Sequence, residues 1–311
     1  MSPPNAGPSR RVADVGGVPM SALVAEVPRP RAVVVALHGG ATTAAYFDAP
    51  NRPRLSLLRT GAALGFTALA LDRPGYGASA ARPDRMATAE ARVDLAYGAI
   101  DELLASRPRG AGVFLVAHSL GCELAVRMAA SGRGGELLGL EISGTGRHYQ
   151  PPAAELLGSR FRGGPPPAPL AGTVRDLVWG GAHLYPEGIA REAGILVSGA
   201  AYEGAVVRAW PHDFPSVAAG VRIPVRYTVA EHEGVWRAGR AGLADVAAMF
   251  TAAPRVETAE QAGGHNLSLG LSARAYHLRV LAFAEECALA RERQSAGSAA
   301  GDAAAEPAIP P

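Results

Sequence analysis

The sequence of 311 residues contains no lysine, and all 30 of its basic residues are arginine. A Schiff-base lysine and the lysine of a phosphate-binding P-loop are therefore excluded, together with the chemistry that depends on them. A dominant charge of one sign is also missing, because the formal net charge is only +2 at pH 7. Nucleic-acid-binding domains carry a clear basic excess, so we expect no nucleic acid as the main partner.

Cysteine and long apolar runs are both scarce. The two cysteines, Cys122 and Cys287, lie far apart and lack the spacing of metal ligands, which predicts neither a disulfide framework nor a zinc site. No stretch reaches the ~18–20 apolar residues of a membrane span, and the first residues, "MSPPNAGPSRR", show no apolar signal segment. We therefore expect a cytoplasmic protein with two buried free thiols and no membrane partner.

What the sequence does contain is an alternation of strand and helix patterns. Apolar runs typical of buried strands occur at 32–39, 67–71, 112–118, 137–144 and 223–231, and helical patterns occur at 55–65, 88–106, 121–130 and 274–293. With 48% hydrophobic residues, the chain can bury a large core. This alternation predicts an α/β fold, with a mostly parallel central sheet flanked by helices on both faces.

Changes in composition divide the chain. Residues 1–10 and 294–311 have little to bury and are predicted to be a disordered N-terminus and a disordered tail. Residues 11–146 and 216–293 carry the alternating pattern and are predicted to form the α/β core. Residues 147–215 interrupt it with Pro- and Gly-rich stretches and short helical patterns. A structureless loop of that length is uncommon in a compact domain, so we expect an inserted, mainly helical cap.

The segment "GVFLVAHSLGCELAVRMAA" (112–130) places Ser119 at the junction of a buried strand and a helix. The residues two before and two after it, Ala117 and Gly121, are small, as in the G-x-S-x-G nucleophile elbow, although alanine replaces the first glycine. Sites in parallel α/β sheets form at the carboxyl ends of the strands. Ser119 is therefore the candidate nucleophile, and the alternative is a serine that only caps the helix.

A serine hydroxyl needs a base, and the base needs an acid that orients it. Around a nucleophile elbow the chain order is serine, acid, histidine. His265 lies in a Gly-rich turn after the strand pattern 255–261, and is the candidate base. The strand pattern at 223–231 continues into "EHE", so Glu231 or Glu233 could be the acid. Strand alternation puts both on one side and does not choose between them.

A tetrahedral oxyanion needs N–H donors aimed at it. The first candidate is the backbone N–H of Leu120, next to the nucleophile. The second is the N–H of Gly40, in the "HGG" turn that follows the strand pattern 32–39. His38, which begins this turn, is expected to contact the substrate. His118 is expected to point away from the site, because it enters the tight turn at the serine.

These motifs together resemble the α/β-hydrolase fold family, over roughly residues 32–293 apart from the cap. "LALDRPGYGAS" (69–79) is similar to the D-x-P-G-x-G-x-S segment of many members, in which the aspartate, Asp72 here, is structural. The family's G-x-x-D pattern at the acid strand aligns with "AEHE", which favours Glu233 over Glu231. Glutamate for aspartate, and alanine for glycine, depart from that pattern.

The resemblance implies hydrolysis of a carboxylic ester or thioester through an acyl-serine, without a metal or organic cofactor. Family branches that open epoxides or remove halides use an aspartate nucleophile, which Ser119 does not match. Two other functions stay open. The same residues could transfer the acyl group to an alcohol or amine or close a lactone, and the scaffold could bind a ligand without catalysis.

The substrate side of the prediction rests on aromatic residues of the cap. Trp179, Tyr185, Tyr202, Trp210 and Phe214 could line an apolar pocket, or could equally pack the cap onto the core. A small apolar or natural-product-like acyl group suits such a pocket, and it could be carried on a carrier protein. The sequence does not reveal the oligomeric state.

Overall fold

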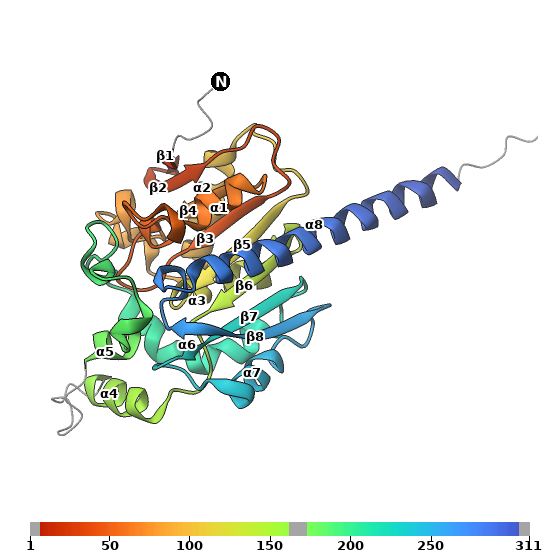
Figure 1. The fold of residues 1–311 in the computed structure, drawn as a ribbon. Helices are drawn as coiled ribbons and strands as arrows, with labels where there is room; N and C mark the ends of the chain where they lie inside the picture. The colour runs from red at the N-terminus through yellow and green to blue at the C-terminus, as the bar shows by residue number, and fades with distance from the viewer. Residues whose placement is uncertain (1–6, 162–172, 305–311) are drawn as a thin grey trace, which may run out of the picture.

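The computed structural model describes residues 7–161 and 173–304 of the chain. These residues form an eight-stranded sheet in the order β1-β2-β4-β3-β5-β6-β7-β8 (Figure 1). The strands are β1 (Ser9–Val15), β2 (Val18–Ala25), β3 (Val33–Leu37), β4 (Thr67–Leu71), β5 (Val113–His118), β6 (Leu137–Ser143), β7 (Val225–His232) and β8 (Val256–Gly264). The pairs β1–β2 and β2–β4 are antiparallel and the other pairs are parallel. The predicted mostly parallel α/β sheet is confirmed.

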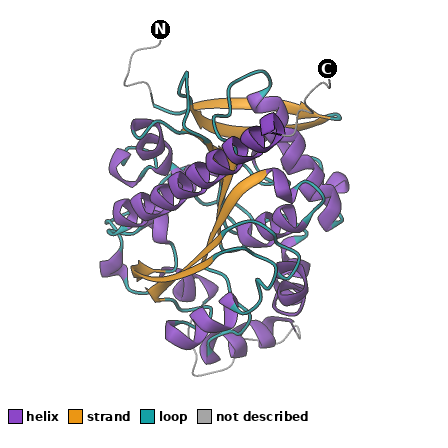
Figure 2. Cartoon of the chain, turned by 90° about the vertical axis from the view of Figure 1, so that its right-hand side faces the viewer, coloured by secondary structure: helices purple, strands orange, loops and turns teal. Residues whose placement is uncertain are grey.

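Helices cover both faces, because the central strands are apolar on both sides. In β3, Val33, Val35 and Leu37 join one core cluster, while Val34 and Ala36 join the other. The first cluster packs against α2 (Ala89–Leu104), α3 (Gly121–Ala130), α6 (Glu203–Ala218) and α7 (Gly239–Ala247), and the second against α1 (Leu57–Ala63) and α8 (Ala273–Ala304). The helix α8 crosses in front of the strands in Figure 2.

Local capping explains where the predicted helices begin and end. The side chain of Thr88 accepts a hydrogen bond from the N–H of Ala91 and caps α2. Ser56 caps α1 in the same way, through the N–H of Arg59. Gly65 follows the end of α1 with a φ of 86°, a conformation that glycine adopts without steric cost.

Both ends of the described chain are more ordered than the sequence predicts. The strand β1 begins at Ser9, and its mixed, largely exposed sequence gave no apolar signal. The helix α8 continues to Ala304, whereas the helical pattern ends near residue 293 and a disordered tail was expected from 294. Its C-terminal part projects beyond the sheet in Figure 1. Five of the eleven residues from 294 to 304 are alanine, the residue with the highest helix propensity, which favours a continuation of the helix. Residues 1–6 and 305–311 lie outside the described residues.

The predicted cap (147–215) is partly built into the core. Its helices are α4 (Pro151–Phe161), α5 (Val174–Trp179) and most of α6, and residues 162–172 lie outside the described residues. The side chains of Trp210 and Phe214 in α6 belong to the core cluster that also contains α3. The segment before α6 contacts the loop that follows β3, where Leu196 forms an isolated β-bridge with Thr42. Only α4 and α5 stand apart from the core (Figure 1).

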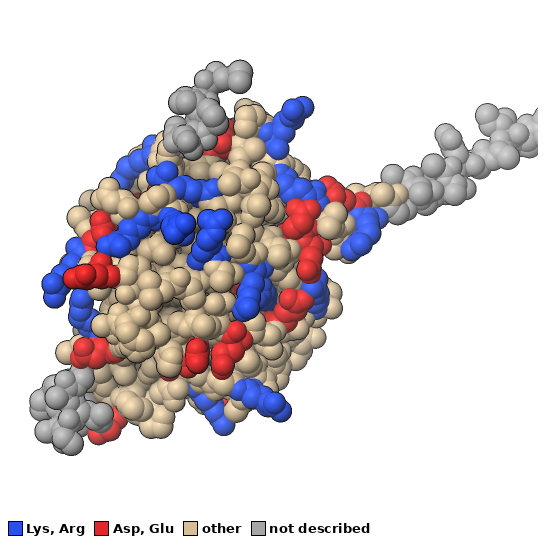
Figure 3. All heavy atoms as spheres, in the orientation of Figure 1, with Lys and Arg blue, Asp and Glu red and all other residues tan. Residues whose placement is uncertain are grey.

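Three predictions made from composition concern membrane spans, surface charge and cysteine. None of the helices within 7–161 and 173–304 is long and apolar enough to cross a membrane. Basic and acidic side chains are interspersed on the face drawn in Figure 3, in keeping with the small net charge. Cys122 and Cys287 are buried free thiols, as predicted.

Asp72 joins three segments next to the site. Its carboxylate accepts hydrogen bonds from the N–H of Ala44 at 2.8 Å and from the hydroxyl of Ser21 at 2.6 Å, and it is 4% exposed. We expect Asp72→Ala to lower the free energy of unfolding by about 3 kcal/mol, since two buried donors lose a charged acceptor. Urea unfolding measures this. In the control, Asp84→Ala removes an exposed carboxylate and should change stability by less than about 0.5 kcal/mol. Equal effects in both variants would contradict the role of Asp72.

Candidate active site

Ser119 sits on a strained turn between β5 and α3. Its φ of 51° is left-handed, which is unfavourable for a residue with a side chain. The turn is held by hydrogen bonds from the N–H of Ser119 to the carbonyl of Ser143 at 2.8 Å, and from the N–H of Cys122 to the carbonyl of Ser119 at 2.9 Å. The serine therefore stands at the carboxyl end of β5 in the geometry that exposes a hydroxyl above a sheet.

The small residues two before and two after Ser119, Ala117 and Gly121, are small for different reasons. Ala117 is fully buried and pairs with Leu37 and Ile142 on the flanking strands, where a methyl group fits. A Cβ at Gly121 would meet the carbonyl oxygen of Leu37, and would lie 2.6 Å from that of His38. Glycine is thus required at 121, whereas alanine in place of glycine at 117 leaves the elbow intact.

His265 and Glu233 form a buried pair. The Nδ1 of His265 lies 2.8 Å and 2.9 Å from the two carboxylate oxygens of Glu233. The carboxylate also accepts a hydrogen bond from the N–H of Val235 at 2.9 Å. His265 follows directly after β8, and Glu233 follows β7 in a turn closed by its own N–H to the carbonyl of Ala230. Glu231, the other acid left open by the sequence, is exposed.

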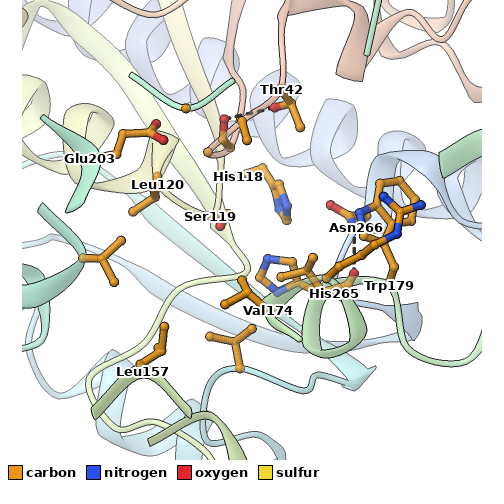
Figure 4. Close-up of a pocket in the computed structure, with 18 of the residues that line it drawn as sticks. Thr42, His118, Ser119, Leu120, Leu157, Val174, Trp179, Glu203, His265 and Asn266 are labelled. Atoms are coloured by element: carbon orange, nitrogen blue, oxygen red, sulfur yellow. Dashed lines mark hydrogen bonds between the residues drawn. The ribbon is translucent and has the colours of Figure 1, made fainter. Parts of the chain in front are cut away.

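The hydroxyl of Ser119 and the imidazole of His265 line the same cavity and lie together in Figure 4. No hydrogen bond joins the Oγ of Ser119 to the ring of His265 in the part of the chain that the structure describes. Such bonds are often long before a substrate binds and tighten in the complex. The Nδ1 contact to Glu233 leaves Nε2 as the ring nitrogen that is available to the serine.

The prediction that His118 points away from the site is wrong. Its ring stacks on Tyr46 at 4.7 Å and meets the ring of His265 edge-on at 4.8 Å, and it lines the cavity. Burial, and secondly the neighbouring His265, hold the pKa of His118 well below its usual range. His118 is therefore neutral and supports the site as a packed ring. His277 is buried in α8, where burial lowers its pKa to about 3.

Gly40 and Leu120, whose N–H groups are the candidate donors, lie against each other. A Cβ on Gly40 would lie 2.7 Å from the Cδ1 of Leu120, so the backbone of Gly40 approaches the residue that follows the serine. Both residues line the cavity. Within the described residues, neither backbone N–H donates a hydrogen bond. Residues 38–42 are called the oxyanion loop below, because an oxyanion on a carbon bonded to Ser119 would face these two groups.

A cavity of about 650 Å³ opens above Ser119. Of the residues predicted to contact substrate, Trp179 and Trp210 line it, and the other four do not. The aromatic and aliphatic residues that line it include Leu120, Tyr149, Leu157, Val174, Val178, Trp179, Leu196, Val207, Trp210, Val235 and Trp236. A volume of this size suits a ligand of roughly drug size, and the mainly apolar wall suits an apolar group.

The four predicted residues that miss the cavity each have another contact. The Nε2 of His38 accepts the N–H of Arg73 at 3.0 Å. The hydroxyl of Tyr185 accepts the N–H of Asn266 at 3.1 Å, beneath the His265 turn. The hydroxyl of Tyr202 donates to the carbonyl of Pro74 at 2.7 Å, and Phe214 stacks on Trp210 at 4.5 Å within the core. Aromatic character predicted that these side chains would be buried, and they pack within the protein without lining the cavity.

Sequence reasoning missed Tyr149, Trp236 and Glu203 as residues of the cavity wall. The rings of Tyr149 and Trp236 stack at 4.4 Å across a β-bridge between two loops. No local pattern predicts a contact between loops 87 residues apart. Glu203 lies in the first turn of α6 and is 8% exposed. The sequence does not predict that this charged side chain is buried, because its partner, Arg73, is distant along the chain.

Within residues 7–161 and 173–304, no group of histidine, cysteine, aspartate and glutamate side chains is arranged to hold a metal ion. The functional groups at the cavity floor are thus a hydroxyl, two imidazoles, a carboxylate behind one of them, and two backbone N–H groups.

Comparison with known proteins gives a family and a set of similar folds. The model of the "Alpha/beta hydrolase family" matches residues 34–285. None of the curated proteins matches the sequence. A thioesterase domain from the curacin biosynthetic pathway aligns with a TM-score of 0.58 at 18% identity, over 89% of this chain and 100% of that one.

Two further solved structures show how varied the relatives of this fold are. A thermostable carboxyl esterase from Bacillus coagulans has a TM-score of 0.63 at 18% identity, covering 91% of this chain and 100% of that one. An epoxide hydrolase from Vigna radiata has a TM-score of 0.60 at 17% identity, covering 90% and 98%. These likenesses show the fold, while the family model spans most of the sequence: the chain belongs to the alpha/beta hydrolase family.

Proposed function

We propose that the protein is a serine hydrolase that cleaves a carboxylic ester or thioester through an acyl-serine intermediate. The observation that carries this proposal is the contact between the Nδ1 of His265 and both carboxylate oxygens of Glu233, in a cavity that Ser119 enters from a strained turn. A carboxylate on Nδ1 fixes the tautomer that leaves Nε2 free to take a proton, and it stabilises the imidazolium that results.

The proposed reaction has two halves. His265 takes the proton of Ser119 as the hydroxyl oxygen attacks the substrate carbonyl, and the N–H groups of Gly40 and Leu120 stabilise the tetrahedral oxyanion. The imidazolium then protonates the leaving alcohol or thiol, and the acyl-serine remains. Water attacks this ester with His265 again as base, which releases a free carboxylic acid and restores Ser119. No metal or organic cofactor takes part.

The substrate class follows from the cavity. Its wall of aliphatic and aromatic side chains supports an apolar acyl group, of natural-product size, and a carrier protein could deliver it as a thioester. The thioesterase and the carboxyl esterase among the similar folds agree with this proposal. The likeness to an epoxide hydrolase does not change the proposed reaction, because the residue at the elbow of this chain is a serine rather than an aspartate. We place the reaction in the cytoplasm.

Labelling with a fluorophosphonate probe tests the nucleophile first. Intact mass and peptide mapping should find one adduct, on Ser119, and none in Ser119→Ala. Ser119→Ala and His265→Ala should each lower kcat for an ester substrate by about 10⁴-fold or more, and the double variant should lose little beyond that, since the residues act as a unit. Circular dichroism shows that the variants are folded. Near-normal turnover in either single variant would overturn the proposal.

The product separates hydrolysis from acyl transfer. With an acyl thioester as substrate, mass spectrometry should find the free acid as the main product, even when an alcohol or amine is added. A product esterified to the added acceptor, or a lactone, would instead assign an acyltransferase or a cyclase with the same catalytic residues.

The assignment of the acid rests on a matched pair of glutamates. Glu233→Gln should lower kcat by about 10³-fold to 10⁴-fold, because an amide cannot stabilise the imidazolium or select the same tautomer. Glu231→Gln, two residues away and exposed, should change kcat by no more than about twofold. Steady-state kinetics on one ester decide the question, and equal, mild losses in both variants would mean that neither residue is the acid.

Val207 lies in the cavity wall on α6, and we expect it to limit the length of the acyl chain. Val207→Phe should lower kcat/KM for long-chain p-nitrophenyl esters by about 10-fold, and leave short-chain esters nearly unchanged, because the larger ring leaves less of the cavity for a long chain. Ala205→Phe, on an exposed position of the same helix, serves as the control. An equal loss for short and long chains would show that the cavity does not bind the acyl group.

A further inference from the structure

The D-x-P-G-x-G-x-S segment holds more than its structural aspartate. Arg73, which follows Asp72, is 1% exposed and reaches under the oxyanion loop. One of its terminal nitrogens donates to the carbonyl oxygen of Gly39 at 3.0 Å, and its backbone N–H donates to the Nε2 of His38 at 3.0 Å. The mechanism proposed above gives Arg73 no part, although it is a buried cation against the loop that faces the oxyanion.

The carbonyl of Gly39 accepts from three donors at once. Besides Arg73, the hydroxyl of Thr42 donates to it at 3.0 Å, and the Nδ1 of His38 lies 2.9 Å away. Since the Nε2 of His38 accepts a hydrogen bond from the backbone N–H of Arg73, Nδ1 carries the hydrogen of the neutral ring and is also a donor. Burial, and secondly the charge of Arg73, keep the pKa of His38 well below its usual range.

The direction of this carbonyl decides the direction of the N–H of Gly40. The two groups belong to one planar trans peptide, so they point to opposite sides of the chain. The carbonyl points to Arg73 beneath the loop, and the N–H therefore points toward the cavity that Gly40 lines. A peptide between two glycines can turn over at little steric cost, so the donors on its carbonyl are what set its direction.

Arg73 is itself held by a residue of the predicted cap. Its guanidinium pairs with the carboxylate of Glu203, in the first turn of α6, and the two side chains are 2% and 10% exposed. A buried arginine is stable only with such a partner. The ion pair thus connects α6 to the Gly39–Gly40 peptide through one side chain.

Ala41, the next residue of the oxyanion loop, is also held by the D-x-P-G-x-G-x-S segment. Ala41 has a left-handed φ of 52°, which is unfavourable for alanine. Its N–H donates to the hydroxyl of Tyr76 at 2.9 Å, and its carbonyl accepts from the N–H of Val197 at 3.0 Å. An unfavourable conformation persists only where its surroundings fix it, and here these are Tyr76 and the segment that precedes α6.

We propose that Arg73 is a positioning residue for the oxyanion hole. It holds the Gly39–Gly40 peptide so that the N–H of Gly40 faces the oxyanion, and Glu203 holds Arg73. This role rests on the proposed function, since it presumes an oxyanion at Ser119. It predicts that loss of the ion pair slows formation of the tetrahedral intermediate and leaves ground-state binding of the acyl group largely intact.

The main test replaces both charges, so that no unpaired charge stays buried. Arg73→Met/Glu203→Gln should lower kcat for an ester, and the second-order rate of fluorophosphonate labelling, by about 10-fold to 100-fold, the effect of a misplaced catalytic group. KM should change less than about threefold, because the loop acts on the transition state. The control, Arg92→Met/Glu123→Gln, removes another buried arginine–glutamate pair that does not touch the loop, and should keep both rates within about twofold.

A second variant avoids the ion pair altogether. Thr42→Val keeps the shape of the side chain and removes one of the three donors to the carbonyl of Gly39. It should lower kcat and the labelling rate about 3-fold to 10-fold, with a similar KM. Thr60→Val is its control, since the hydroxyl of Thr60 donates to the carbonyl of Ser56 in α1, away from the site.

A crystal structure of the double variant completes the test and separates the two proposals. If wild-type protein fails to label at Ser119, the proposed function has failed and the role in an oxyanion hole with it, and the crystal structure then decides only whether Arg73 holds the Gly39–Gly40 peptide. A peptide that is turned over or present in two orientations supports that role. An unchanged peptide overturns it, as do labelling rates in both loop variants that equal those of their controls.

Discussion

The geometry of the site depends on the backbone contact between the start of α3 and the end of β3. A Cβ on Gly121 would lie 2.6 Å from the carbonyl oxygen of His38, so helix and strand end are as close as two backbones can be. Ser119 precedes this glycine by two residues, and the oxyanion loop begins at His38. The distance between Ser119 and the oxyanion loop is therefore fixed by the sheet and one helix, before any side chain contributes.

Burial and pairing then give the histidines around the serine different properties. His38 and His118 are buried and their pKa values are held well below the usual range, so both rings stay neutral. Of these three rings, that of His265 alone contacts a carboxylate. The carboxylate of Glu233 is fixed by the N–H groups of Val235 and Trp236. This arrangement is what favours His265 as the base in the proposed reaction. His38 instead serves as a hydrogen-bonded ring and His118 as a packed ring.

The sequence predicts those parts of the molecule that local patterns determine. Strand and helix periodicity predicts the central sheet and its covering helices, and the order of Ser119 and His265 along the chain follows from the elbow and the Gly-rich turn. The choice between Glu231 and Glu233 does not follow from strand alternation. The pairing of β7 with β8 shifts register between Ala230 and His232, and the chain then turns, so the period of two no longer applies there.

Predictions failed where a contact joins distant segments. The sequence left open whether the aromatic residues of the cap line a pocket or pack onto the core, and the structure divides them. Trp179 and Trp210 line the cavity, Tyr185, Tyr202 and Phe214 pack elsewhere, and Tyr149 and Trp236 reach the cavity from separate loops. Aromatic composition predicts that a residue will be buried, but the partner that buries it is decided by tertiary structure.

The walls of the cavity differ in how firmly they are held. On one side Trp210 donates through its indole N–H to the hydroxyl of Thr145 at 3.0 Å and stacks on Phe214, so this wall is continuous with the core. On the other side α5 has no buried residue, although Val174, Val178 and Trp179 line the cavity. A segment with few buried contacts opens at a lower free energy than the core. The cavity wall on α6 is thus preorganised, and the wall on α5 is held by fewer buried contacts.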